Sequence, residues 1–149
     1  MTSNAPLEPL FVLVDDHKHS ARLMRRAMQA TTSPARVAWI GSARRAERTL
    51  LRLLGSSGID RPDMVIVDLK SQSGASADFI SRIGNFVADA NVPLAAIADT
   101  GAAECRRELL DSGADAVFVR HHELDAYRAE MASLVDFWVR ETVTWPIRA

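Results

Sequence analysis

Short apolar runs alternate with longer amphipathic segments along most of the chain. The first run, Phe11 to Val14, is continuous and stops at Asp15 and Asp16. Such a run is typical of a strand that is buried on both faces of a parallel sheet. Similar runs cover residues 37–40, 64–69, 94–98 and 116–119. The pattern therefore predicts five strands.

The segments between these runs have the spacing of amphipathic helices. After Ser20, which is expected to cap the first helix, Leu23, Met24, Ala27 and Met28 recur at helical intervals. Further helices are predicted after Ser42 and over residues 79–87, 102–112 and 124–139, with Gly113 as a C-terminal cap. Five strands alternating with five helices predict an α/β fold, a doubly wound five-stranded parallel sheet flanked by five helices.

The length of 149 residues suits one compact domain. Residues 1–9 contain two prolines and are predicted to form a flexible leader, followed by the domain over residues 10–140. Residues 141–149 are predicted to form a C-terminal extension, which contains Trp145 and Pro146. Trp138, just before it, is expected either to fill the core or to take part in binding.

Composition narrows the function classes. The formal net charge of -1 gives no global attraction to nucleic acid or to an anionic membrane. Cys105 is the only cysteine, which excludes an internal disulfide and a metal cage of cysteines. The N-terminus lacks the features of a secretion signal, and no apolar stretch is long enough to span a membrane. We therefore expect a soluble, cytoplasmic protein.

Three carboxylates are predicted to meet at one edge of the sheet. Asp15 and Asp16 follow the first strand and Asp68 lies near the end of the third, and ligands of such folds bind at the carboxyl ends of the strands. Clustered carboxylates repel one another unless a cation binds or a pKa rises. Oxygen ligands favour Mg²⁺, beside which a carboxylate can attack a phosphoryl group. The alternative is that Asp15 and Asp16 only cap the following helix.

Three segments together resemble a known family. FVLVDDHKHSARLMRRAM, PDMVIVDLK and SGADAVFVR are similar to motifs of response-regulator receiver domains, over about residues 10–139. The resemblance implies a CheY-like, flavodoxin-like fold in a two-component signalling protein rather than an enzyme. It implies that Asp68 is the phosphoacceptor and that Asp15, Asp16 and Asp68 hold Mg²⁺.

The same resemblance implies the partners. A receiver domain takes its phosphoryl group from a sensor histidine kinase or a phosphotransfer protein and acts on a downstream protein. The face formed by the fourth helix, the fifth strand and the fifth helix commonly makes a homodimer. Neither nucleic acid nor a membrane is an expected partner of this chain.

Several positions depart from the family pattern. Ala98 stands where receivers carry a hydroxyl, with Thr100 nearby as a possible substitute, and Val117 replaces the aromatic switch residue. Arg120 replaces the usual Lys; its planar guanidinium could clamp a phosphate or pair permanently with Asp68. The loop after Asp68 begins with Lys70 and lacks the usual Met-Pro.

Two hypotheses follow from these departures. In the first, the chain is an atypical single-domain response regulator that is phosphorylated on Asp68 and acts through protein contacts. In the second, it is a pseudo-receiver that serves as an adaptor or dimerisation module without phosphotransfer. A separate enzymatic activity has no nucleophile and base pair to support it.

Two further groups of side chains have alternative interpretations. His17, His19, His121 and His122 are predicted at the same edge as the carboxylates, either as solvated or capping groups or as part of a mixed metal site. Arg44, Arg45, Arg48 and Arg52 follow one another along the second helix. They are either a solvated helix face that covers apolar surface or a stripe for an acidic partner or nucleic acid.

Overall fold

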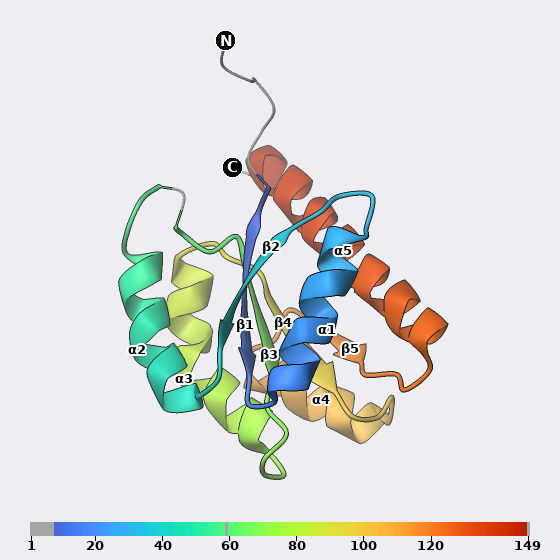
Figure 1. Cartoon of the computed structure of the whole chain (residues 1–149). Coiled ribbons are helices and arrows are strands. Elements are labelled where there is room, and N and C mark those ends of the chain that lie inside the picture. The colour runs from blue at the N-terminus through green and yellow to red at the C-terminus, as the bar shows by residue number, and fades with distance from the viewer. Residues whose placement is uncertain (1–7, 59, 149) are drawn as a thin grey trace.

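The protein forms one parallel five-stranded sheet in the order β2-β1-β3-β4-β5 (Figure 1). The computed structural model describes residues 8–58 and 60–148, with side chains up to residue 142. The strands are β1 (Leu10–Asp15), β2 (Arg36–Ile40), β3 (Met64–Asp68), β4 (Leu94–Ala98) and β5 (Ala116–Val119). All four pairings between neighbouring strands are parallel. The predicted doubly wound sheet is therefore confirmed.

Five helices cover the two faces of the sheet. They are α1 (Lys18–Gln29), α2 (Ala43–Leu54), α3 (Ala75–Asp89), α4 (Ala103–Ser112) and α5 (Leu124–Arg148). One core holds side chains from α2, α3 and α4, and the other holds side chains from α1 and α5. In Figure 1, α1 and α2 lie on either side of the edge strand β2.

Alternating residues of the central strands supply the two cores. Val12 and Val65 face α2, α3 and α4, whereas Phe11 and Met64 face α1 and α5, as the two-residue period of a strand requires. Every residue of β1 and β3 is buried. This double burial explains why the sequence shows continuous apolar runs there.

The ends of three helices differ from the prediction. Helix α1 begins at Lys18, so Ser20 lies inside the helix and His17 precedes it without a side-chain cap. Helix α3 begins at Ala75, because Gly74 adopts a left-handed φ of 78° and Ser76 ties the helix to the loop after β3 by accepting a hydrogen bond from the Leu69 amide at 3.0 Å. The predicted caps Ser42 and Gly113 are confirmed.

Helix α5 runs to Arg148 and not to Val139 as predicted, since no glycine or proline interrupts residues 139–142. Trp138 packs edge-on against Phe11, with ring centroids 5.6 Å apart, and its Nε1 donates to the Asp63 carbonyl at 3.1 Å. Residues 1–7 of the predicted leader and the side chains of Trp145 and Pro146 lie outside the described part. Among the described helices, none combines the length and the apolar character that a membrane span requires.

Candidate functional site

Two buried carboxylates face each other where β1 and β3 end. Asp15 and Asp68 are partners in the parallel register of these strands, which is why residues 53 positions apart meet here. Asp15 is fully buried and Asp68 is 3% exposed. Of the described residues, these are the only carboxylates classed as buried. The predicted meeting of Asp15 and Asp68 at the carboxyl edge is therefore observed.

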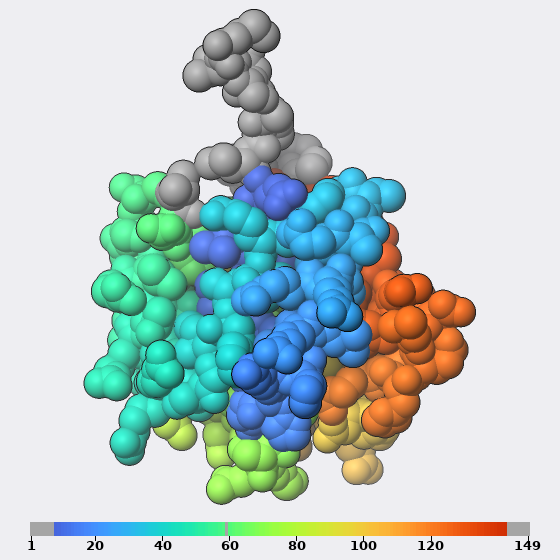
Figure 2. All heavy atoms as spheres, viewed as in Figure 1, coloured from blue at the N-terminus to red at the C-terminus, as the bar shows by residue number. Residues whose placement is uncertain are grey.

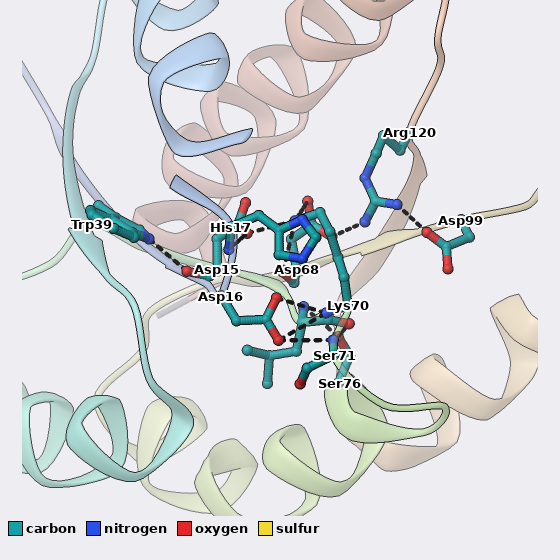
Figure 3. A network of polar contacts seen from close by, with 11 residues as sticks. Asp15, Asp16, His17, Trp39, Asp68, Lys70, Ser71, Ser76, Asp99 and Arg120 are labelled. Carbon is teal, nitrogen blue, oxygen red and sulfur yellow. Dashed lines mark hydrogen bonds and ion pairs between the residues drawn. The ribbon is translucent and has the colours of Figure 1, made fainter. Parts of the chain in front are cut away.

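The ammonium group of Lys70 lies between these two carboxylates (Figure 3). Its Nζ is 2.6 Å from Oδ1 of Asp15 and 3.0 Å from Oδ2 of Asp68. It also donates to the backbone carbonyl of Asp68 at 3.1 Å. The Lys70 side chain is only 10% exposed. A cation supplied by the chain itself thus neutralises the repulsion that the sequence predicts at this edge.

Arg120, which follows β5, holds the other oxygen of Asp68. Its guanidinium bonds to Oδ1 of Asp68 through one terminal nitrogen and to Oδ1 of Asp99 through the other. Burial opposes the charge of Arg120, but Asp68 and Asp99 outweigh that effect and raise its pKa above the usual value. Of the two roles considered for Arg120, the structure shows the ion pair with Asp68.

Asp16 is turned away from the other two carboxylates. Its Oδ1 accepts a hydrogen bond from the Lys70 amide at 3.0 Å, and its Oδ2 accepts one from the Ser71 amide at 2.9 Å. Burial raises the pKa of Asp16, but the hydrogen bonds from Ser71 and Lys70 lower it by more. The pKa therefore lies below its ordinary value of 3.8. Asp16 therefore fixes the loop that carries Lys70.

Replacing Asp16 by Ala is expected to destabilise the domain by about 1–2 kcal/mol at neutral pH, because two loop amides lose a charged acceptor. A lowered pKa in the folded state stabilises the protein above pH 3.8, and this contribution disappears as the pH falls through the lowered pKa. Urea denaturation across the acid range should therefore show the difference between variant and wild type shrinking below pH 3.8. A difference that is independent of pH would contradict this role of Asp16.

One carboxylate oxygen of Asp15 is buried and accepts no hydrogen bond. Burial raises the pKa of Asp15; the hydrogen bond from Lys70 lowers it, and the nearby Asp68 raises it again, so that it ends above its ordinary value. Oδ1 accepts hydrogen bonds from Lys70 and from the His17 amide. Oδ2 is buried and has no hydrogen-bond partner. The charge of Asp15 therefore depends on Lys70.

The arrangement does not fit a divalent cation as it stands. Lys70 fills the space between Asp15 and Asp68, and Asp16 points at loop amides. Across the described residues, no group of three or more His, Cys, Asp or Glu side chains is placed to hold a metal ion. The expected binding of Mg²⁺ by Asp15, Asp16 and Asp68 stays a prediction.

The remaining predicted positions lie around this centre. Ala98 ends β4 and is buried, and its carbonyl accepts from the Arg120 amide at 2.8 Å. Thr100 is exposed and its Oγ1 accepts from the Ala102 amide at 3.2 Å, so its hydroxyl serves the turn before α4. Nε2 of His121 lies 3.5 Å from Oε1 of Glu130.

Sequence reasoning did not assign a role to Lys70 or Asp99. Lys70 is one of only two lysines and follows Asp68 by two residues, which is a usable signal. Its position between the carboxylates depends on the loop conformation that Asp16 fixes. Asp99 directly follows β4, so its place at the carboxyl edge could have been inferred from the strand pattern.

Comparison with known proteins gives structural similarity only. A scan against protein-family models and a search of curated proteins found no match. The phosphorylated cyanobacterial phytochrome response regulator RcpA has a TM-score of 0.71 at 18% identity, over 89% of this chain and 95% of that one. The receiver domain of the putative Luxo repressor protein from Vibrio parahaemolyticus has a TM-score of 0.70 at 18% identity, over 96% and 99%. The fold is that of a receiver domain.

A third receiver-fold neighbour was solved with a metal. The Mn²⁺-bound form of response regulator Rcp1 has a TM-score of 0.66 at 14% identity, covering 87% of this chain and 94% of that one. All three neighbours are matched over nearly their full length. The receiver fold expected from the sequence is therefore confirmed. At such low identity, the similarity shows the fold and nothing about function.

Proposed function

We propose that this protein is a signalling module of the two-component type that acts through protein contacts and does not require a phosphoryl group on Asp68. One observation carries the proposal: both carboxylate oxygens of Asp68 are ion-paired, one with Lys70 and the other with Arg120. The second of the two sequence-based hypotheses, the pseudo-receiver, is thus the one that the geometry supports best.

The chemistry of phosphorylation explains why these ion pairs matter. An oxygen of Asp68 would have to attack phosphorus while the bond from phosphorus to the leaving oxygen breaks. In this protein each oxygen lies against a cation, and the Asp68 side chain is only 4% exposed. Attack by either oxygen therefore competes with an ion pair, and displacing Lys70 or Arg120 would leave a buried, unpaired charge.

Incubation with acetyl phosphate, and separately with beryllofluoride, each with Mg²⁺, tests the proposal. We expect no phosphoryl adduct by intact mass and no spectroscopic change in the wild-type protein. The double variant K70M/R120K, which removes the bridging cation and restores the usual lysine, is the matched comparison and is expected to gain an adduct. The triple variant that also carries Asp68→Asn should lose it.

The second candidate is a phosphorylated response regulator, and the position of Asp68 favours it. Asp68 ends β3 opposite Asp15, in a fold shared with the phosphorylated regulator RcpA. Its partner would be a histidine kinase or a phosphotransfer protein. An adduct on the wild-type protein that is lost in Asp68→Asn would establish this function and overturn the first. Homodimer formation through α4, β5 and α5 remains a prediction under either function.

A further inference from the structure

A cavity of about 190 Å³ lies between the first turns of α1 and the first turns of α5. Figure 2 shows these helices beside each other, α1 in blue and the start of α5 in orange. The lining residues include Leu23 and Met24 on α1 and Tyr127 and Met131 on α5. A cavity of about 150 Å³ can hold benzene, so this one, which we call the α1–α5 cavity, has room for a single aromatic ring with a small substituent.

Four apolar side chains line the α1–α5 cavity. Met24, Met131 and Ile97 of β4 are buried, whereas Leu23 is 41% exposed. Methionine side chains are unbranched and adapt to irregular shapes, and their sulfur atoms make favourable contacts with aromatic rings. A ligand in the cavity would also cover the exposed surface of Leu23. The apolar lining therefore suits an aromatic ring.

Two polar groups at the cavity have no partner in the described part of the chain. Nε of Arg120 is buried and makes no hydrogen bond, although the two terminal nitrogens bond to Asp68 and Asp99. Figure 3 shows Nε on the same side of the guanidinium as the nitrogen that bonds to Asp68, which also lines the cavity. The hydroxyl of the buried Tyr127 makes no hydrogen bond to any described residue. Since buried polar groups are normally paired, these two groups indicate a ligand that supplies an oxygen.

The electrostatic surroundings of Tyr127 disfavour a negative charge in the cavity. Burial raises the pKa of Tyr127 above its ordinary value of 10.0, and the negative charges of Asp68 and Asp15 raise it further. Arg120 lowers this pKa, but by less. The hydroxyl is therefore protonated at neutral pH and can donate a hydrogen bond to a ligand. An anionic ligand would meet the same unfavourable surroundings.

A positive charge is no better accommodated. A cationic ligand would lie beside Arg120 and would find both oxygens of Asp68 already paired. His121 and His122 also line the cavity, and His122 is exposed. Any ion would lose part of its hydration among the apolar side chains. The cavity therefore suits an uncharged ligand.

We propose that the α1–α5 cavity binds a small, uncharged aromatic molecule that carries one hydroxyl or carbonyl oxygen. The ring packs between Met24 and Met131, and the oxygen bonds to Nε of Arg120 and to the hydroxyl of Tyr127. Such a ligand would lie against the ion pair of Arg120 with Asp68, so a small molecule could act on the carboxyl edge of the sheet. Binding there does not depend on whether Asp68 is phosphorylated.

Phenol and toluene are the probes, because they have the same size and differ in one substituent, a hydroxyl or a methyl group. Binding is followed by the methyl resonances of labelled methionine in the full chain. Met24 and Met131 line the cavity, whereas Met28 and Met64 are buried but are not among its lining residues. We expect phenol to shift the first two resonances in a saturable way and to leave the other two nearly unchanged.

The relative affinities test the chemistry of the ligand. A purely apolar cavity would bind toluene more tightly than phenol, since the phenol hydroxyl would lose its hydration. We expect phenol to bind at least as tightly as toluene, because Arg120 and Tyr127 bond to the hydroxyl. Benzoate and benzylamine carry a negative and a positive charge at neutral pH, and each should bind at least about tenfold more weakly than phenol.

Tyr127→Phe removes the hydroxyl and keeps the ring. The loss of one hydrogen bond should weaken phenol binding by about fivefold, whereas toluene binding should stay within about twofold of wild type. Because the hydroxyl has no partner among the described residues, the melting temperature should change by less than about 2 °C. A merely structural role of Tyr127 would instead weaken both probes equally.

Two leucine variants test the location. Leu23→Ala removes an apolar wall of the cavity and should weaken both probes by about threefold or more. Leu51 is 51% exposed and lies on α2, which covers the other face of the sheet. Leu51→Ala is therefore the matched control, and its affinity for both probes should stay within about twofold of wild type.

The site would be overturned if none of the four probes gave saturable shifts of Met24 and Met131, or if Leu51→Ala weakened binding as much as Leu23→Ala. Tighter binding of toluene than of phenol would contradict a ligand with an oxygen. Tighter binding of benzoate or benzylamine than of phenol would contradict an uncharged ligand. The acetyl phosphate experiment has a different readout, so the proposed function can fail while this ligand site stands.

Discussion

Replacing Lys70 by Met is expected to turn the acidic pocket into a divalent-cation site. The ammonium of Lys70 is the cation between Asp15 and Asp68, at 2.6 and 3.0 Å. Its loss leaves a fully buried Asp15 without a counter-ion, which costs about 3–5 kcal/mol for a buried pair. Mn²⁺ or Mg²⁺ would restore stability by binding only the folded state, by about 2.7 kcal/mol at a hundredfold excess over its Kd.

Thermal melting with and without Mn²⁺ measures this effect. The K70M variant should melt well below the wild type and recover with the metal, whereas the wild type should barely respond. Lys18 is the only other lysine and is exposed on α1, so K18M is the matched control and should change neither stability nor metal response. A wild-type protein that gains as much from Mn²⁺ as K70M would show that Lys70 does not block the site.

Replacing Asp68 by Ala is expected to destabilise the protein by about 3 kcal/mol, although Asp68 lies beside another acidic residue. In a pocket of carboxylates alone, removing one would relieve repulsion and stabilise the fold. Here it would leave Lys70 and Arg120 facing a single buried carboxylate. A loss of stability on replacing Asp68 by Ala therefore indicates a pocket whose charges are neutralised, and a gain indicates a pocket of repelling carboxylates.

Asp99 provides the comparison, since Arg120 bonds to both carboxylates. The Asp68 side chain is 4% exposed and that of Asp99 is 75% exposed. Water screens the exposed pair, so Asp99→Ala should cost less than about 1 kcal/mol. Urea denaturation of both variants measures the contrast. Equal costs, or a more stable Asp68→Ala variant, would contradict the ion-pair description of the site.

The fold was predictable because its signals are local and periodic. The runs in β1 and β3 are apolar throughout because both faces of these strands are buried. The meeting of Asp15 and Asp68 followed from the rule that parallel strands end at one edge. The end of α5 was misplaced because the apolar spacing was followed only as far as Val139, whereas the helix continues through Arg140 and Glu141, which favour helix formation.

The chemistry of the site was less predictable, because it depends on loops. Nothing in the order of residues states that Asp16 turns toward the amides of Lys70 and Ser71. That turn removes one carboxylate from the predicted metal site and brings in a lysine. The replacement of the usual Lys by Arg120 was visible in the sequence, whereas its second bond, to Asp99, required the structure.

The cation of Lys70 differs from a dissolved ion in one respect, because it is part of the chain. A tethered group competes for its site at an effective concentration in the millimolar range for a flexible link, and here Asp16 fixes the backbone that carries Lys70. Chelators cannot remove such a cation, and dilution does not weaken it. This cation is therefore present at the edge of the sheet whenever the chain is folded.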